Sequence, residues 1–187
     1  MEKHLEVPVK ETELKNLESG DYVYLTGVIY TARDAAHKRM FDSLKEGKSI
    51  PVDLQDQFVY YLGPTPARKG QVIGSAGPTT SSRMDKYTPL LLDKGLKGMI
   101  GKGKRSKEVI QSMVKNGAVY FAAVGGAGAL LSKCIKKSEV IAYDDLGTEA
   151  IRRLEVENFP VIVVIDSKGH NLYETAVDEF QKNAGKN

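Results

Sequence analysis

The sequence predicts an α/β fold in which helices flank a mixed sheet. Apolar or β-branched runs of strand length alternate with segments of helical period along the 187 residues, a length that fits one domain. Glycine-rich or hydroxyl-rich turns stand between several of these strands and the helices that follow them. The run at residues 161–165 is wholly apolar, which is typical of a central strand covered on both faces.

The expected strands are enriched in β-branched and aromatic residues. They fall at residues 4–9, 21–30, 58–62, 71–76, 97–100, 118–124, 135–143, 151–156, 161–165 and 171–173. Inside the second strand, Gly27 indicates a bulge or a close approach of another backbone segment.

Two helices have a clear N-cap residue and a C-terminal glycine: Asp34 and Gly47 around residues 35–46, and Ser106 and Gly117 around residues 107–116. A helical segment that begins near residue 81 is expected to end or kink at Pro89. We expect residues 1–175 to form a single domain and residues 176–187 to form a helical or flexible tail.

Composition argues against several classes of protein. The chain is 41% hydrophobic and 27% charged, as in ordinary globular proteins, and its formal net charge of +3 is too weak to favour a nucleic-acid partner. No apolar run approaches the roughly 20 residues that span a bilayer, and the first residues lack the apolar core of a signal peptide. We therefore expect a cytoplasmic protein with no membrane association.

The chain has one cysteine, Cys134, and three histidines that are well separated in sequence. One thiol cannot form an internal disulfide, and it cannot hold an iron–sulfur cluster, which takes several thiolates. We therefore expect no metal site in this chain, so any metal chemistry would have to come from another chain. Cys134 is expected to be a small core residue.

Residues 77–85, Gly-Pro-Thr-Thr-Ser-Ser-Arg-Met-Asp, are the first candidate site. A strand, a tight turn and a helix N-terminus are expected here, which would bring backbone N–H groups, the hydroxyls of Thr79 and Thr80 and the guanidinium of Arg83 to one point. That arrangement suits a carboxylate or a phosphate. The alternative is a capped helix with an exposed arginine.

Three more strand-to-helix junctions carry Arg33, Lys102 and the pair Gly125 and Gly126. Glycines flank Lys102, but the spacing of a P-loop is absent, and the glycines near residue 125 are a weak match to a dinucleotide fingerprint. Sites in α/β folds gather where strands end and helices begin. If the junctions share one edge, three cations and two threonines would suit a dicarboxylate or a phosphate. The residues alone predict half of an active site, or a binding module.

Several stretches in register then resemble one family. Residues 77–85, 21–27 (Asp-Tyr-Val-Tyr-Leu-Thr-Gly), 32–37 (Ala-Arg-Asp-Ala-Ala-His), 101–103 (Gly-Lys-Gly), 146–151 (Leu-Gly-Thr-Glu-Ala-Ile) and 156–160 (Val-Glu-Asn-Phe-Pro) are similar to the β subunit of class I fumarate hydratases. They also resemble the C-terminal domain of the single-chain forms and, more distantly, the β subunit of L-tartrate dehydratase. The resemblance spans nearly the whole chain.

The resemblance implies a swivelling β/β/α domain that pairs with a separate α subunit in a hetero-oligomer, with a homodimer as the alternative for the chain alone. The α subunit of this family carries a four-iron four-sulfur cluster, in which the iron that lacks a cysteine ligand binds a substrate carboxylate and hydroxyl as a Lewis acid. The implied reaction is the reversible hydration of fumarate to (S)-malate.

The resemblance also implies roles for single residues. Arg33, Arg83 and Lys102 would hold the substrate carboxylates. Thr79 would lie at the reacting carbon as the candidate base, with Thr80 beside it. A threonine hydroxyl is a very weak acid, so this role requires a nearby cation that stabilises the alkoxide.

Other residues receive a secondary place. His37 is expected to be a polar helix-face residue or a hydrogen-bond partner, and it is a candidate for lining the site. Gly125 and Gly126 are packing glycines first and site lining second. Lys104 and Arg105 are expected to form a solvated charge run, with contact to the α subunit as the alternative.

Three functions remain open at this stage. We favour a fumarate hydro-lyase subunit; the alternatives are the same role for tartrate or a methylated dicarboxylate, and a non-catalytic anion-binding or assembly module. Ser81 and Ser82 stand where some fumarases have Ala-Gly, but tartrate dehydratase β subunits also have serine near here, so the pair does not decide the substrate. Residues 104–106 look more like the fumarase form.

Overall fold

The computed structural model describes residues 1–124 and 128–185. Its seven strands are β1 (Glu2–Val7), β2 (Tyr22–Thr31), β3 (Phe58–Tyr60), β4 (Gly98–Gly101), β5 (Val119–Ala123), β6 (Ile135–Ala142) and β7 (Ile151–Ile165). Its helices are α1 (Glu11–Leu14), α2 (Asp34–Lys45), α3 (Thr88–Asp93), α4 (Lys107–Asn116), α5 (Gly128–Lys133) and α6 (Leu172–Ala184), with 3₁₀ turns η1 (Ser81–Met84) and η2 (Asp144–Glu149). The expected α/β class with a mixed sheet and flanking helices is confirmed.

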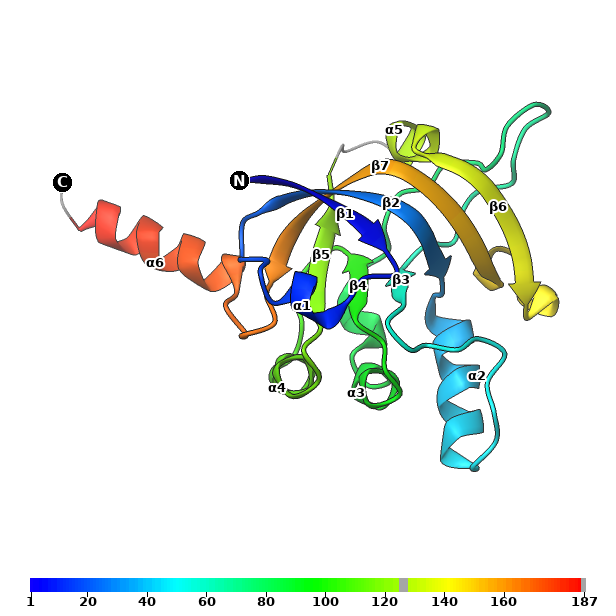
Figure 1. The fold of residues 1–187 in the computed structure, drawn as a ribbon, viewed down its shortest axis with the longest axis horizontal. Coiled ribbons are helices and arrows are strands. Elements are labelled where there is room, and N and C mark those ends of the chain that lie inside the picture. The colour runs from blue at the N-terminus through cyan, green and yellow to red at the C-terminus, as the bar shows by residue number, and fades with distance from the viewer. Residues whose placement is uncertain (125–127, 186–187) are drawn as a thin grey trace.

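The sheet closes on itself through β7. Strands β1 to β5 pair in parallel, each with the next. β7 runs antiparallel to β2 along most of its length, and it also pairs with β6 through its first half and with β5 through its last residues. Strands β2, β3, β4, β5 and β7 therefore form a ring, with β1 and β6 outside it. Figure 1 shows β2 and β7 curving over the shorter strands, and α2, α3 and α4 below them.

β7 is one strand of 15 residues, so the expectation of two strands at residues 151–156 and 161–165 is wrong. The residues between them form an irregularity within the strand and do not break it. Asn158 takes a positive φ of 49°, and its amide donates to Thr26 Oγ1 at 3.1 Å, while pairing with β2 continues on both sides. The antiparallel ladder to β2 thus holds the two halves together.

Gly27 lies at a bulge in β2 and also at a close approach of another backbone segment, the two features expected at this position. The register between β2 and β7 shifts between Leu25 and Gly27, and the φ of Gly27 is 128°. A Cβ at this position would lie 2.1 Å from the carbonyl oxygen of Val7. Only glycine therefore allows β1 to approach this closely.

The core consists of two apolar clusters, one on each face of the sheet. Successive residues of a strand alternate between them: in β3, Phe58 and Tyr60 belong to the first cluster, and Val59 belongs to the second. The second cluster includes buried side chains from the covering helices, namely Met40, Leu91, Leu92, Val109 and Met113. Sheet and helices together bury both faces, as an α/β fold requires.

The capping signals set the helix boundaries well. Ser106 accepts a hydrogen bond from the Val109 amide at 3.3 Å at the start of α4, and Gly117 ends that helix in the left-handed region with φ 66°. For α2 the expected N-cap is wrong by one residue, because Arg33 is the N-cap and Asp34 is already the first helical residue. Pro89 lies in the first turn of α3, where its missing N–H is harmless, so it helps to begin a helix.

Two expected strands are absent from the described chain. Residues 71–76 form the returning arm of a long loop, in which the Thr65 amide donates to Ser75 O at 3.3 Å and the Ser75 amide donates to Thr65 Oγ1 at 2.7 Å. Val72 lines a cavity together with Lys136 and Lys137 of β6, an edge strand that pairs with β7, but residues 71–76 form no ladder with it. At residues 171–173 there is only a bridge between Asn171 and Ile165 before α6 begins.

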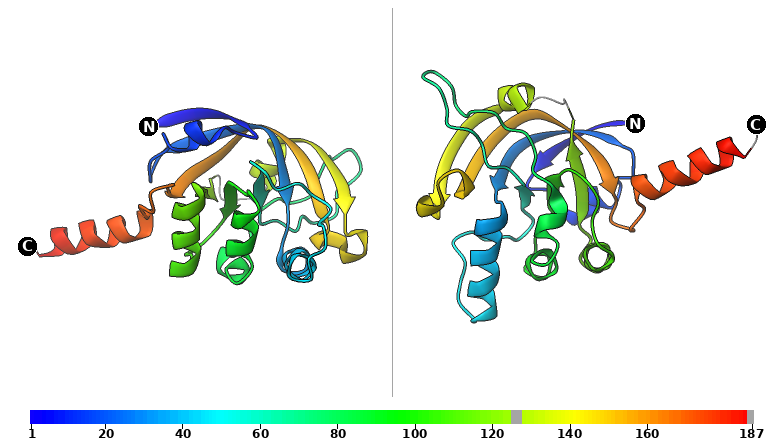
Figure 2. Two further views of the ribbon diagram at one scale, coloured as in Figure 1. Left: turned by 60° about the horizontal axis from the view of Figure 1, so that its bottom comes forward. Right: turned by 180° about the vertical axis from the view of Figure 1, so that it is seen from behind.

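α6 extends away from the rest of the molecule in all the views (Figures 1 and 2). It begins at Leu172 and so runs across the expected boundary at residue 175, while the division into a domain and a tail stays a prediction. Among the helices of the described residues, none has the length and apolar character needed to cross a bilayer.

Candidate functional site

The ends of three parallel strands bring the candidate residues to one edge of the sheet. Arg33 lies two residues after β2, and Lys102 directly follows β4. Thr79 is distant from both in sequence, but its amide donates to the carbonyl oxygen of Tyr61, the first residue after β3, at 2.8 Å. Since β3 pairs between β2 and β4, these three positions are neighbours.

The local structure of residues 77–85 differs from the expectation. No strand leads in, and the helix that follows is the four-residue 3₁₀ turn η1, so the predicted strand, turn and helix N-terminus is wrong. Thr80 instead pairs with Lys102 in a single parallel bridge, and the Ser81 amide donates to the carbonyl oxygen of Lys102 at 2.9 Å. The segment that carries the threonines is therefore held directly against the segment that carries Lys102.

Arg33 presents an unsatisfied donor at this edge. Its side chain is only 25% exposed, and its guanidinium lies against Gly63, where an added Cβ would come within 2.5 Å of Nη1. Arg33 Nε is buried without a hydrogen-bond partner among the described residues, and Glu149 Oε1 lies 4.0 Å from it. Buried polar groups are normally paired, so the guanidinium of Arg33 is incompletely satisfied by the described residues.

The other two cations differ from each other. Arg83 forms a bidentate ion pair with Asp34, with Nε 3.0 Å from Oδ1 and Nη2 2.6 Å from Oδ2, which ties the threonine segment to the first turn of α2. Lys102 is exposed, and its ammonium has no hydrogen bond or ion pair within the described part of the chain. Lys102 is thus available to an anion, whereas Arg83 already has a carboxylate partner.

His37 is fully buried in α2, and the expectation that it is a hydrogen-bond partner is confirmed. Its Nδ1 lies 2.8 Å from the carbonyl oxygen of Arg33. Because a carbonyl oxygen only accepts, Nδ1 carries the proton and Nε2 does not in the neutral ring. Burial lowers the pKa of His37 to about 4, although the hydrogen bond to Arg33 raises it. The ring is therefore neutral at pH 7 and fixes the backbone of Arg33.

We expect His37 to make the fold sensitive to acid. A histidine with a folded pKa near 4 and an unfolded pKa near 6.5 gives stability that is present above pH 6.5 and is lost as the pH falls toward 4. The loss over that window is about 3 kcal/mol. Urea unfolding of the wild type and of His37→Asn at pH 7 and pH 4.5 measures it. Equal pH dependence in the two proteins would contradict this assignment.

Arg105 is a structural residue at the centre of this region. Its side chain has no exposed surface, so the expected solvated charge run is wrong for Arg105, whereas Lys104 is exposed. The guanidinium donates to Asp85 Oδ1 at 2.7 Å, to Tyr61 Oη at 3.1 Å and to Thr88 Oγ1 at 2.9 Å. Asp85 also accepts from the Ser106 amide at 2.8 Å. This network joins the loop after β4 to the segment that follows the threonines.

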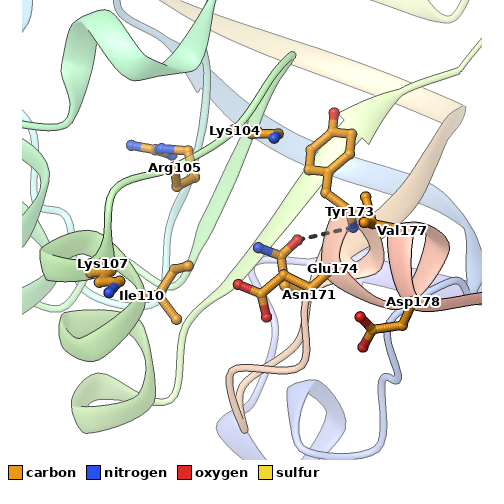
Figure 3. A pocket seen from close by; sticks show the side chains of 9 residues that line it. All are labelled: Lys104, Arg105, Lys107, Ile110, Asn171, Tyr173, Glu174, Val177 and Asp178. Carbon is orange, nitrogen blue, oxygen red and sulfur yellow. Dashed lines mark hydrogen bonds between the residues drawn. The ribbon is translucent and has the colours of Figure 1, made fainter. Parts of the chain in front are cut away.

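Cavities of about 400, 460 and 440 Å³ lie near the end of α2, beside α5 and beside β6, and none of the three is lined by Arg33, Arg83 or Lys102. A pocket of about 290 Å³ between α4 and the start of α6 is lined by the residues drawn in Figure 3, with the Arg105 guanidinium directed away from the α6 side chains. None of the three candidate cations lines this pocket. Lys102 is therefore exposed on a surface outside these cavities.

The remaining candidates, Gly125, Gly126 and Cys134, contribute no described contact to the edge that carries Arg33, Thr79 and Lys102. Gly125 and Gly126 lie outside the described residues, but nearby Gly128 accepts a hydrogen bond from the Ala76 amide at 3.1 Å. Cys134 is partly buried, and burial raises the pKa of its thiol. No group of three His, Cys, Asp or Glu side chains within the described ranges could hold a metal ion.

The sequence did not predict three contacts in this region. Asp34 pairs with Arg83, Glu149 lies beside Arg33, and Ser81 is hydrogen-bonded to Tyr120. Glu149 also accepts from the Ala35 amide at 3.4 Å, at the N-terminus of α2. A tyrosine inside the otherwise apolar run at residues 118–124 was the one available signal, because a buried hydroxyl needs a partner.

The fold is an α/β domain whose parallel strands bring Arg33, Thr79 and Lys102 to one edge of the sheet. Comparison with known proteins gives the family. The family model described as "Fumarase C-terminus" matches residues 2–176, and the chain belongs to this family.

The chain is similar to fumarate hydratase 1 of Leishmania major, with 44% identity over 80% of this chain and 28% of the relative. It is 37% identical to the anaerobic class I fumarate hydratase of Escherichia coli over 96% of this chain and 33% of the relative. It therefore spans about a third or less of these fumarate hydratases. A protein named as a candidate L(+)-tartrate dehydratase subunit beta from Methanocaldococcus jannaschii is 40% identical over 87% of this chain and 86% of the relative.

Proposed function

We propose that this chain is the β subunit of a two-subunit class I fumarate hydratase, which catalyses the reversible hydration of fumarate to (S)-malate. The observation that carries the proposal is the meeting of Arg33, Thr79 and Lys102 at one edge of the sheet, where the exposed Lys102 ammonium has no partner among the described residues and Arg33 Nε has only the 4.0 Å contact to Glu149. Relatives named as fumarate hydratases contain a matching segment as about a third of their length, which supports a role as one part of a larger catalytic unit.

In this proposal the cations hold the two carboxylates of fumarate. The planar guanidinium of Arg33 suits one carboxylate, and Lys102 acts on the other as a point charge. Arg83 joins them when a substrate carboxylate replaces Asp34 in the ion pair. Thr79 is the candidate base, with Thr80 beside it. The bridge from Thr80 to Lys102 keeps a cation close to the threonines, where it would stabilise the alkoxide.

The proposal includes a cytoplasmic hetero-oligomer with an α subunit that holds a four-iron four-sulfur cluster. A single cysteine cannot ligate such a cluster, so we assign none of its ligands to this chain. When bound in the α subunit, the cluster supplies a Lewis acid. The part of this chain is to bind and orient the dicarboxylate and to move a proton at the reacting carbon.

A role in tartrate dehydration is the second candidate. The observation that favours it is length: the chain covers 86% of the relative named as a tartrate dehydratase β subunit. Both substrates are dicarboxylates of four carbons, and the same cations could hold either. The difference must therefore come from groups that contact the hydroxyls, which makes turnover the deciding measurement.

The test is anaerobic turnover of fumarate, (S)-malate and tartrate by this chain with and without an iron–sulfur α subunit from the same source. We expect the pair to hydrate fumarate and neither chain to do so alone. Activity on tartrate only would move the assignment to the second candidate. An intact cluster with no activity on any of these dicarboxylates would overturn the enzymatic role and leave an anion-binding or assembly module.

A further inference from the structure

A buried tyrosine on β5 links the two segments that carry the candidate site residues. Tyr120 Oη lies 2.8 Å from Ser81 Oγ, directly after the two threonines, and 2.8 Å from the carbonyl oxygen of Gly103, directly after Lys102. The Lys102 segment follows β4 and the threonine segment comes from the long loop after β3, so this hydroxyl on β5 is a shared attachment point for both. Tyr120 itself is fully buried.

The order of protons along this link is fixed. The carbonyl oxygen of Gly103 can only accept, so the single proton of Tyr120 is donated to it. Ser81 Oγ must then donate to Tyr120 Oη. Burial raises the pKa of the Tyr120 hydroxyl well above its ordinary value, which keeps this proton in place over the working pH range.

The surroundings leave the link little room to move. A Cβ at Gly101 would lie 2.0 Å from Ser81 Oγ, so the serine fills the space beside the β4 backbone. The guanidinium of Arg105 lies over the Tyr120 ring, 5.0 Å from its centre, and Asp85 holds that guanidinium in turn. Dense packing of this kind transmits a small displacement to both segments.

We propose that Tyr120 is a positioning residue for the dicarboxylate site, which holds the segment of Thr79 and Thr80 in register with the segment of Lys102 through its bonds to Ser81 and Gly103. This inference rests on the proposed function, because the alignment of the two segments affects turnover only if they bind the substrate and transfer a proton. Catalytic geometry is sensitive to displacements of about 1 Å, so a loosened register should reduce turnover although Tyr120 never touches the substrate.

The test is the variant Tyr120→Phe, which removes the hydroxyl and keeps the ring. In the reconstituted pair we expect kcat/KM for fumarate to fall by roughly 10- to 100-fold. In the isolated chain we expect the Ser81 amide, which donates to Lys102 O, to exchange its hydrogen at least about tenfold faster by NMR. Ser81→Ala should give similar losses, and the double variant should lose little more, because both single changes break the same link.

Asp21→Asn is the matched control. Asp21 is buried at the opposite end of β2, where Lys3 Nζ lies 2.6 Å from Oδ2, so this variant weakens the fold far from the edge. Asp21→Asn should lower the free energy of unfolding but leave kcat, KM and the exchange rate of the Ser81 amide at their wild-type values. Wild-type kinetics and wild-type Ser81 exchange in Tyr120→Phe and in Ser81→Ala would overturn the inference. An inactive wild-type pair would instead overturn the proposed function, and the exchange measurement would still test the register.

Discussion

Replacing Thr79 by alanine should lower kcat for fumarate hydration by the reconstituted pair by about 10²- to 10⁴-fold, the usual contribution of a positioned acid or base. The backbone of Thr79 is fixed by the hydrogen bond from its amide to Tyr61 O at 2.8 Å, so the change removes a hydroxyl from a defined position. Steady-state kinetics under anaerobic conditions measures the loss. Because the hydroxyl acts in proton transfer, KM should change much less than kcat.

Two further variants make the Thr79 result interpretable. Thr79→Ser keeps the hydroxyl and should retain activity within about tenfold of the wild type. Ser82→Ala removes an exposed hydroxyl from the same stretch, which the proposal does not use, and it should leave kcat unchanged. If Thr79→Ala turns over at the wild-type rate, Thr79 is not the base, and the proton must be moved by a group outside this chain or by another residue of the edge.

Replacing Arg33 by lysine should raise KM for fumarate by roughly 30-fold with a smaller effect on kcat. A charged hydrogen bond contributes about 1.5–3 kcal/mol, and lysine cannot offer the planar pair of donors that a carboxylate accepts from arginine. The loss of stability should be small, because the 4.0 Å contact from Arg33 Nε to Glu149 is one that a lysine ammonium can also make. Kinetics and a urea unfolding curve on the same preparation separate the two effects.

Arg39→Lys is the matched control on the same helix. Arg39 forms a bidentate ion pair with Asp145, with distances of 2.8 and 2.7 Å, and both side chains are exposed. It should leave KM unchanged, since exposed ion pairs contribute little. An unchanged KM in Arg33→Lys would mean that the substrate carboxylates bind elsewhere.

The parts of the fold that the sequence predicts are those decided by local chemistry. The boundaries of α4 follow from the hydroxyl of Ser106 and the left-handed conformation of Gly117. Gly27 marks a close contact because only a residue without a side chain fits there. The candidate residues come together because parallel strands end at a common edge, so a motif after one strand is near a motif after the next.

The parts of the fold that the sequence does not predict depend on hydrogen bonds and ion pairs between separate segments of the chain. Residues 71–76 have the composition of a strand, but the hydrogen bonds between Thr65 and Ser75 pair them with the other arm of their own loop. The sequence predicts that Arg105 belongs to a solvated charge run. In the structure it is buried, paired with Asp85 and packed over the rings of Tyr61 and Tyr120. The pairing of Arg83 with Asp34 depends in the same way on contacts between distant segments.

In the proposed function, Arg33 and Lys102 form the dicarboxylate-binding half of a shared site. A crystal structure of the reconstituted pair with succinate would test this, because succinate has both carboxylates of the substrate but neither a double bond nor a hydroxyl to react. We expect one carboxylate within hydrogen-bond distance of the Arg33 guanidinium and the other near the Lys102 ammonium. Succinate bound in the α subunit without contact to either side chain, at an occupancy that does not change in Arg33→Lys, would contradict it.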